Sequence, residues 1–217
     1  MDSSELARLL DLSAAQRQGL ERYAALLRAW NERINLVSRN SLADLWQRHM
    51  LDSAQLLAAL PPAPPDRPLR IADLGSGGGF PGLVLAILGA GELHLVESDG
   101  RKAAFLAEVS RETGAAAEVH LARIETLAPL AADCVTARAL APLPKLLGYV
   151  ARHLAPGGRA LLPKGRGREG ELTEARASWS MRVSERPSLS GPDGGILVVE
   201  GLRRRGGSSD RKKGRKA

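Results

Sequence analysis

The sequence reads Ile-Ala-Asp-Leu-Gly-Ser-Gly-Gly-Gly-Phe-Pro-Gly from Ile71 to Gly82, a short apolar run that ends in a burst of glycines. A second apolar run, Leu83–Leu88, follows at once. This order predicts a strand, a tight turn and the start of a helix. Glycine permits positive φ in such a turn and lets a ligand approach the backbone, while a helix start offers free N–H groups. We therefore expect this loop to hold a small molecule against the main chain.

Strand and helix patterns alternate on the C-terminal side of the loop. Strands are expected at about residues 69–74, 93–97, 117–121, 133–137, 159–163, 181–185 and 196–199. Helices are expected at about residues 81–88, 101–113, 143–150 and 169–177. This alternation predicts an α/β fold with a parallel sheet of about seven strands and helices on both faces. The last two strands are joined by a short polar link, so the last strand is expected to be antiparallel.

The first 60 residues predict a helical extension. Residues 13–16 have the form of a capping box, and the apolar residues behind them share one helical stripe: Leu20, Tyr23, Leu27, Trp30 and Ile34. Ser41 is expected to cap a further helix that continues to Leu60. Prolines between residues 61 and 68 rule out a helix and predict a stiff linker. The core is then expected over residues 69–202, followed by a basic disordered tail over residues 203–217.

Charge and composition bound the class of protein. The tail holds eight basic residues and one acidic residue, which account for the whole net charge of +7, so residues 1–202 are neutral overall. Such a tail either keeps the protein soluble or binds phosphates without specificity, and the sequence favours neither. No apolar run reaches the roughly 18 residues that a membrane span requires, and the N-terminus does not resemble a signal peptide. With a single cysteine, Cys134, we expect a cytoplasmic monomer without a disulfide.

The glycine loop matches G-x-G-x-x-G from Gly77 to Gly82, a pattern that alone also occurs in dinucleotide-binding proteins. Asp73 stands before the loop, where a carboxylate can reach the amino group of a zwitterionic ligand. Pro81 takes the place of an amide that a pyrophosphate would use. Glu97 ends the next strand, where either class places an acid on ribose hydroxyls. Together with an antiparallel last strand, these features favour a Rossmann-like S-adenosylmethionine methyltransferase over an NAD(P) oxidoreductase.

Several stretches together resemble the RsmG (GidB) family of bacterial 16S rRNA guanine-N7 methyltransferases. They are Arg48-His49-Met50-Leu51-Asp52-Ser53, Asp73–Gly82, Glu97-Ser98-Asp99-Gly100-Arg101-Lys102 with Phe105-Leu106, Arg138-Ala139-Leu140-Ala141 and Lys164-Gly165. The resemblance covers about residues 20–199 and leaves out the basic tail. It implies transfer of a methyl group from S-adenosyl-L-methionine to N7 of a guanine, conventionally position 527, in the 16S rRNA of the small subunit.

The resemblance also places the site residues. It implies cofactor contacts at Gly75, Phe80, Ile124, Glu125 and Arg138. The candidates taken from the residues around the loop and the next strand are Asp73, Gly77 and Glu97. The substrate is then 16S rRNA or a 30S subunit. Arg48, His49, Lys164 and Arg166 are candidates for RNA contacts, with Arg168 beside them. Each has a second interpretation, since His49 can simply pack within its helix and the basic side chains can be solvated.

The reaction implied by this family needs few catalytic groups. Guanine N7 carries a free lone pair at neutral pH, so no catalytic base is expected and alignment with the methyl donor carries the reaction. Cys134 lies early in a strand and is expected to be a buried hydrophobe rather than a nucleophile. The four histidines, at positions 49, 94, 120 and 153, show no metal-ligand spacing with it, so no metal is expected. A methyltransferase acting on a small molecule or a protein, and a non-catalytic nucleic-acid-binding module, stay open as alternatives.

Overall fold

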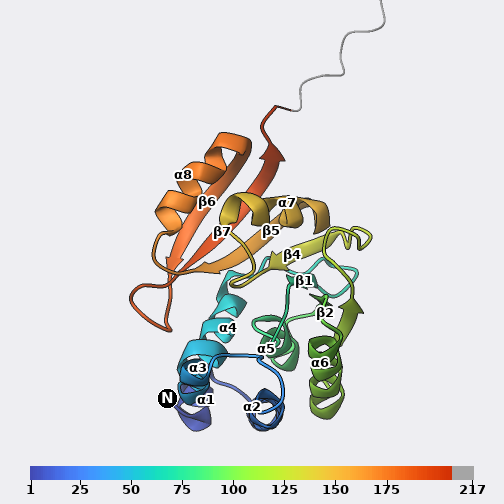
Figure 1. Cartoon of the computed structure of the whole chain (residues 1–217), viewed down its shortest axis with the longest axis vertical. Helices are drawn as coiled ribbons and strands as arrows, with labels where there is room; N and C mark the ends of the chain where they lie inside the picture. The colour runs from blue at the N-terminus through green and yellow to red at the C-terminus, as the bar shows by residue number, and fades with distance from the viewer. Residues whose placement is uncertain (207–217) are drawn as a thin grey trace, which may run out of the picture.

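The computed structural model of the chain describes residues 1–206. A seven-stranded sheet with the order β3-β2-β1-β4-β5-β7-β6 forms its centre (Figure 1). The strands are β1 Arg70–Leu74, β2 Glu92–Glu97, β3 Ala117–Leu121, β4 Ala132–Thr136, β5 Leu154–Lys164, β6 Trp179–Pro187 and β7 Gly195–Arg204. Strand β7 is antiparallel to both of its neighbours, whereas the pairs from β3 to β5 are parallel. The predicted α/β fold with one antiparallel strand among seven is confirmed.

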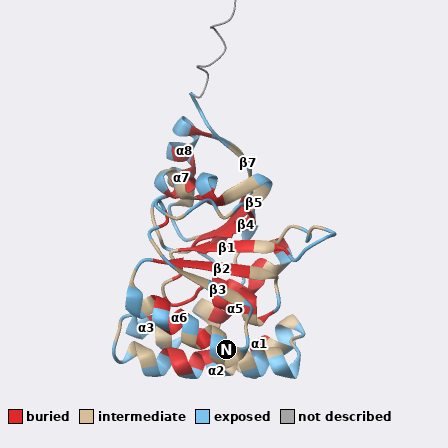
Figure 2. Ribbon diagram, turned by 90° about the vertical axis from the view of Figure 1, so that its right-hand side faces the viewer, coloured by how far each residue is buried: buried red, intermediate tan, exposed pale blue. Residues whose placement is uncertain are grey.

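Helices cover both faces of this sheet (Figure 1). Helices α5 (Gly82–Ile87) and α6 (Gly100–Thr113) share one core cluster with the N-terminal helices and with β1 and β2. Helices α7 (Leu143–His153) and α8 (Arg168–Ser178) form a second cluster with β4, β5 and β7. The buried residues concentrate in the central strands (Figure 2), while none of the residues of β3, at the edge of the sheet, is buried.

The N-terminal helices α1 (Ser3–Leu10) and α2 (Ala14–Asn31) pack on the sheet layer rather than standing apart from it. The predicted capping box is present, because Ser13 Oγ accepts the Gln16 amide hydrogen and the Gln16 side chain accepts that of Ser13. Tyr23 and Leu27 of the predicted apolar stripe are fully buried. Residue 60 therefore marks a change of secondary structure, while the hydrophobic core continues across it.

The segment that follows α2 differs from the single helix predicted from Ser41 to Leu60. Helix α3 (Arg39–Ala43) begins earlier because Ser38 is the N-cap and accepts the amide hydrogen of Ser41. A π-helix, η1 (Trp46–Leu51), the short α4 (Asp52–Ala54) and a 3-10 helix, η2 (Gln55–Ala59), follow. Apolar spacing does not distinguish these helix types over so few residues. A π-turn is often found at functional sites, and this one carries His49.

Two expected boundaries near the C-terminus were wrong. Strand β5 begins at Leu154 rather than at Arg159. It therefore contains Ala155–Gly158, and a register shift opposite β4 accommodates these residues. Strand β7 continues to Arg204, inside the predicted tail, and the Arg205 amide donates to the Ser178 carbonyl. The rest of the predicted tail, residues 207–217, lies outside the described residues. Within residues 1–206, no helix combines the length and apolar character needed to cross a bilayer.

Candidate functional site

A cleft of about 770 Å³ opens where β1, β2 and β4 end. Open α/β sheets bind ligands at this edge, and the volume suits a small molecule. Seven of the eight residues predicted to contact a cofactor line the cleft: Gly75, Gly77, Phe80, Glu97, Ile124, Glu125 and Arg138. The fold therefore brings together residues from four separate segments, because each segment lies at the end of a strand.

The glycine loop has the backbone that its sequence predicts. Gly75, Gly77 and Gly79 have φ values of +68°, +54° and +91°, in the left-handed region that favours glycine. A Cβ atom at Gly79 would lie 2.4 Å from Leu83 Cδ1, so this position also lacks room for a side chain. The Tyr23 hydroxyl, from helix α2, donates to the carbonyl oxygen of Gly78. The N-terminal helices thus fix the loop that faces the cleft.

Asp73 is the predicted cofactor residue that the structure does not bring to the cleft. Its carboxylate is buried, with Oδ1 accepting from the Thr136 hydroxyl at 2.7 Å and Oδ2 accepting from the Gly82 amide at 3.3 Å. Burial raises the pKa of this carboxyl, and the hydrogen bonds from Thr136, Ser76 and Gly82 oppose that rise. Asp73 therefore connects β1 to β4 and to the start of α5, and it shapes the loop from behind.

Glu97 lines the cleft and also holds the loop. Its Oε2 accepts from the Gly77 amide at 2.9 Å, and its Oε1 accepts from the amides of Ser98 and Asp99 at 2.8 Å. A carboxylate has about four lone-pair sites, so these three bonds leave acceptor capacity for a ligand hydroxyl. A negative charge is thereby fixed at the end of β2, beside the cleft.

An aromatic stack forms the wall next to the loop. The ring of Phe80 lies between Tyr23 and His49, with ring centroids 5.1 Å and 4.8 Å away, and the guanidinium of Arg138 lies 5.1 Å from the Phe80 centroid. Phe80 is almost completely buried by these neighbours. Stacked rings and a cation on a ring face are mutually favourable contacts, which give the wall one defined conformation.

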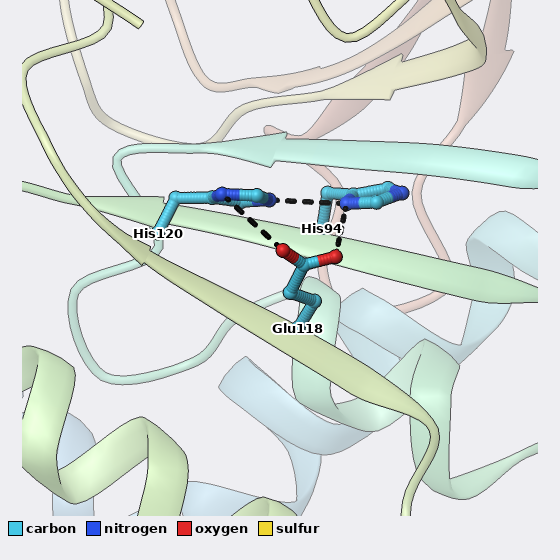
Figure 3. Close-up of side chains that lie close together, drawn as sticks. All are labelled: His94, Glu118 and His120. Atoms are coloured by element: carbon cyan, nitrogen blue, oxygen red, sulfur yellow. Dashed lines mark hydrogen bonds and ion pairs between the residues drawn. The ribbon is translucent and has the colours of Figure 1, made fainter.

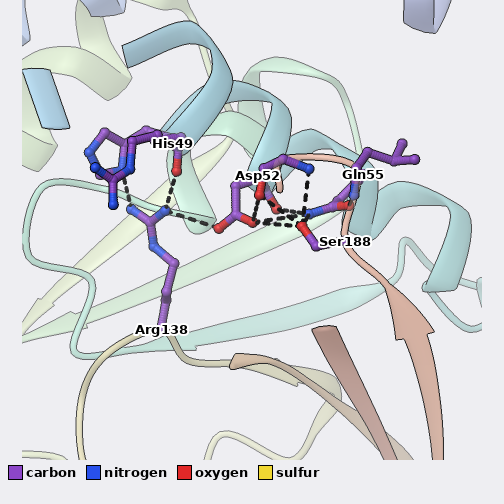
Figure 4. A network of polar contacts seen from close by, with 8 residues as sticks. His49, Asp52, Gln55, Arg138 and Ser188 are labelled. Atoms are coloured by element: carbon purple, nitrogen blue, oxygen red, sulfur yellow. Dashed lines mark hydrogen bonds and ion pairs between the residues drawn. The ribbon is translucent and has the colours of Figure 1, made fainter. Parts of the chain in front are cut away.

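Arg138 connects the loop after β4 to the π-helix (Figure 4). One guanidinium nitrogen donates to the Arg48 carbonyl at 3.1 Å and to Asp52 Oδ2 at 3.2 Å, and the other donates to His49 Nδ1 at 2.8 Å. Asp52 is the carboxylate partner of Arg138. Because the pair is mostly shielded from solvent, the network holds these side chains in a fixed geometry.

Asp52 extends the network to the loop between β6 and β7. Its Oδ1 accepts from the Ser190 hydroxyl at 2.7 Å and from the Gln55 amide group at 3.0 Å, and Ser188 lies beside them (Figure 4). Hydrogen bonds through Asp52 therefore join the cleft to the loop between β6 and β7, which lies more than 130 residues away in sequence.

His49 is held as a neutral imidazole. Burial lowers its pKa to about 3, and the nearby charges of Arg138 and Arg48 act in the same direction. Since Nδ1 accepts from Arg138, the proton of the neutral ring is assigned to Nε2. That Nε2 atom is buried and has no partner among the described residues. His49 lines the cleft as a residue, but its Nε2 atom is not exposed to the cleft.

A second cavity of about 850 Å³ adjoins the cleft. The two share Arg48, Arg138, Ala139 and Leu140 as lining residues. Lys164 lines the second cavity, where it donates to Glu171 at 2.7 Å, whereas Arg166 lines neither cavity and is paired with Asp193 on the surface. The four RNA candidates are thus divided: Arg48 and His49 lie at the cleft, Lys164 lies in the second cavity, and Arg166 lies outside both.

Sequence reasoning missed three basic residues that line the cleft: Lys102, Arg123 and Lys145. No carboxylate among residues 1–206 forms an ion pair with any of them. Lys102 belongs to the stretch quoted for the family resemblance, so its position after β2 was a usable signal. Arg123, in the loop after β3, and Lys145, in the first turn of α7, come to the cleft only because the segments that follow β3 and β4 converge there.

Cys134 lies on β4 and is fully buried. Burial raises the pKa of its thiol to about 12, so it is uncharged at neutral pH and is not a nucleophile. The expectation of a buried hydrophobic cysteine is confirmed.

Comparison with known proteins adds independent findings. Residues 16–193 match the family described as rRNA small subunit methyltransferase G. The Ribosomal RNA small subunit methyltransferase G of Rhodospirillum centenum is 55% identical over 205 residues, which are 92% of this chain and 93% of that protein. The protein of that name from Paramagnetospirillum magneticum is 52% identical, over 90% of this chain and 95% of its own. A solved TehB-like SAM-dependent methyltransferase from Corynebacterium glutamicum has a TM-score of 0.56 over 81% of this chain and 98% of its own, at 19% identity, which shows a shared fold alone.

Proposed function

Because the chain belongs to the family of rRNA small subunit methyltransferase G, it is an S-adenosylmethionine-dependent rRNA methyltransferase, and we propose that it methylates N7 of guanine 527 in 16S rRNA. The cleft beside the glycine loop binds the methyl donor, and the adjoining cavity receives the guanine. One observation carries this assignment of sites: the two cavities meet at Arg48, Arg138, Ala139 and Leu140. These four residues line the junction of the two cavities, and a donor and an acceptor bound in them meet at this junction.

The residues of the cleft fit S-adenosylmethionine. Glu97 has spare acceptor capacity for ribose hydroxyls, and the buried Ile124 offers an apolar contact for an adenine ring. When bound, S-adenosylmethionine supplies a methyl group activated by a sulfonium. Asp73 takes part only indirectly, since its carboxylate fixes the loop that makes the cleft.

The protein side chains at the junction suit attack by N7. Guanine N7 needs no proton removed, and the neutral His49 and the paired Arg138 provide no base there. Methylation makes the base cationic, so a cation held directly against N7 would oppose it. Asp52 offsets the charge of Arg138, and the low pKa of His49 keeps that ring uncharged. The contribution of Asp52, His49 and Arg138 is to fix the geometry of the acceptor without adding an unpaired charge of their own beside it.

The RNA backbone is assigned to the basic rim of the cleft. Lys102, Arg123 and Lys145 have no ion pair among residues 1–206, so each can approach a phosphate without losing a carboxylate partner. Lys164 is already paired with Glu171, and its role is to shape the second cavity beside a base. RNA readers usually bind unstacked bases, and a pocket next to a charged rim is suited to one.

Membership of the family overturns the alternative that the protein is an NAD(P) oxidoreductase. A methyl-transfer assay tests the proposal that the acceptor is RNA. The purified protein and labelled S-adenosylmethionine are incubated together with one acceptor in each reaction. The acceptors are 30S subunits, naked 16S rRNA, and a cytosolic extract that contains proteins and metabolites. Label in 16S rRNA, from the 30S subunit or the naked RNA, is expected. Label confined to the extract would refute the rRNA acceptor and support a small-molecule or protein acceptor. Calorimetry with S-adenosylmethionine and with NAD tests the cleft separately, and binding of NAD alone would refute the cofactor assignment.

A further inference from the structure

A cluster of three side chains with metal-binding atoms lies on the sheet, away from the cleft and the second cavity. His94, from β2, faces Glu118 and His120, from β3 (Figure 3). The ligand atoms of these three residues all lie within 4.8 Å of one another. None of them lines the cleft or the adjoining cavity, so the reaction proposed above does not use them.

The register of the sheet explains why the sequence spacing concealed this cluster. His94 and Glu118 are direct partners in the parallel pairing of β2 with β3. His120 lies two residues beyond Glu118, and side chains alternate along a strand, so both point to the same face. A search for close spacing along the chain misses such a set, since His94 and His120 lie on the two strands of one strand–helix–strand unit, with helix α6 between them.

The distances suit a tetrahedral cation. His94 Nδ1 lies 3.0 Å from His120 Nε2 and 3.4 Å from a carboxylate oxygen of Glu118. Zinc binds histidine nitrogen and carboxylate oxygen at about 2.0–2.2 Å, which separates neighbouring ligand atoms by about 3.3 Å in a tetrahedron. One cation can therefore reach all three groups after small side-chain rotations, and solvent at the exposed Glu118 supplies the fourth position.

A second carboxylate orients the buried histidine. His94 Nε2 lies 3.1 Å from Glu92 Oε1, on the same strand. A neutral His94 that donates from Nε2 to Glu92 keeps Nδ1 unprotonated, with its lone pair toward His120 and Glu118. Metal-binding histidines almost always have such a carboxylate, carbonyl or water on the other ring nitrogen. The cluster thus has both the ligands and the group that fixes the tautomer of one of them.

We propose that His94, Glu118 and His120 form a binding site for a divalent transition-metal cation, with zinc as the expected ion. Two imidazoles and one carboxylate favour zinc over magnesium or calcium, which prefer oxygen ligands alone. The site connects the edge strand β3 to β2. Strand β3 has no buried residue of its own, and it leads directly into Ile124 and Glu125 at the cleft. Zinc therefore stabilises the fold at this edge, whatever molecule the cleft binds.

Zinc binding by the untagged, chelator-treated full chain tests the proposal. Competition with a colorimetric zinc chelator measures the affinity, thermal unfolding measures stabilisation, and visible absorption of the Co²⁺-loaded protein reports tetrahedral ligands. One ion per chain is expected, with a higher melting temperature. The exposed Glu118 is the safest ligand to change, and Glu118→Gln and His120→Gln are each expected to weaken binding at least about 10-fold. Glu92→Gln removes the orienting carboxylate and is expected to weaken it about 10-fold.

Glu174→Gln on helix α8 is the matched control, because it removes one exposed carboxylate far from the cluster and is expected to bind zinc like the wild type. The proposal is overturned if the wild type shows no binding at micromolar zinc, or if Glu118→Gln binds as tightly as Glu174→Gln. Normal circular dichroism of each variant confirms that a loss of binding is not a loss of folding.

Discussion

Arg138 is the side chain at which the two cavities meet, and Arg138→Lys tests whether its geometry or only its charge matters. Lysine keeps the positive charge opposite Asp52. A single ammonium group, however, cannot reproduce the planar fork that donates to the Arg48 carbonyl, to Asp52 and to His49 at once.

The size of the effect follows from the bonds that lysine fails to make. Hydrogen bonds that involve a charged group contribute about 1.5–3 kcal/mol each. The substitution loses two of the three contacts, and Arg138 is slightly exposed, so water replaces part of the loss. The free energy of unfolding is expected to fall by about 2 kcal/mol. A displacement of about 1 Å in a reacting group can lower a rate about 100-fold, and kcat/KM is expected to fall by about that factor.

Urea denaturation and methyl transfer to 30S subunits measure the two effects. Arg22→Lys is the matched control, because Arg22 is an exposed arginine that is also paired with a carboxylate but lies outside both cavities. The control is expected to be within about 0.5 kcal/mol and twofold of the wild type. If Arg138→Lys has the stability and kcat/KM of the control, the fork geometry at the junction plays no part in catalysis and the argument is wrong.

Three further predictions follow from burial and packing. A histidine whose pKa is lowered in the folded state resists protonation there. Its contribution to the stability of the fold is therefore complete above the unfolded-state pKa of about 6.5 and is lost as the pH falls below that value. Between about pH 7.5 and pH 5, the free energy of unfolding should therefore fall by up to about 2 kcal/mol more in the wild type than in His49→Gln, and equal slopes by chemical denaturation would contradict the neutral His49. Gly82→Ala places Cβ 2.8 Å from Asp73 Oδ2 and should lower the free energy of unfolding by about 1–3 kcal/mol. Gly148→Ala, at an exposed and uncrowded position of α7, should instead raise it by about 0.5–1 kcal/mol. Thermal unfolding that ranks the two variants the other way would contradict the packing at Gly82. Cys134 should react with iodoacetamide only in denaturant, as followed by intact-mass spectrometry, and rapid labelling of the native chain would contradict its burial.

The glycine loop shows how far local sequence determines structure here. Apolar periodicity and glycine placement predicted the strand, the turn and the helix around Gly75–Gly82, because these depend on near neighbours. The direction of the Asp73 side chain could not be predicted in this way. It turns inward because Thr136, on a strand that is distant in sequence, donates to it at 2.7 Å.

Positions at the carboxyl edge of the sheet were predictable for a similar reason. Glu97, Ile124 and Arg138 follow strand ends, and parallel strands bring their ends together. The partners of Arg138 needed the fold, since neither the π-helix that carries His49 nor the short α4 that begins at Asp52 has a clear signature in the apolar pattern. The pairing of Lys164 with Glu171 and the register of β2 with β3 likewise depend on tertiary packing.

Mapping N7-methylguanine in 16S rRNA tests the central claim most directly. Unmethylated 30S subunits or their naked 16S rRNA are incubated with the purified protein and S-adenosylmethionine, and the RNA is then cleaved chemically at N7-methylguanine and read by primer extension. One new stop that maps to guanine 527 is expected, and it should be absent without S-adenosylmethionine and strongly reduced with Arg138→Lys. Methylation at another base, at another atom of that guanine, or nowhere in 16S rRNA would contradict it.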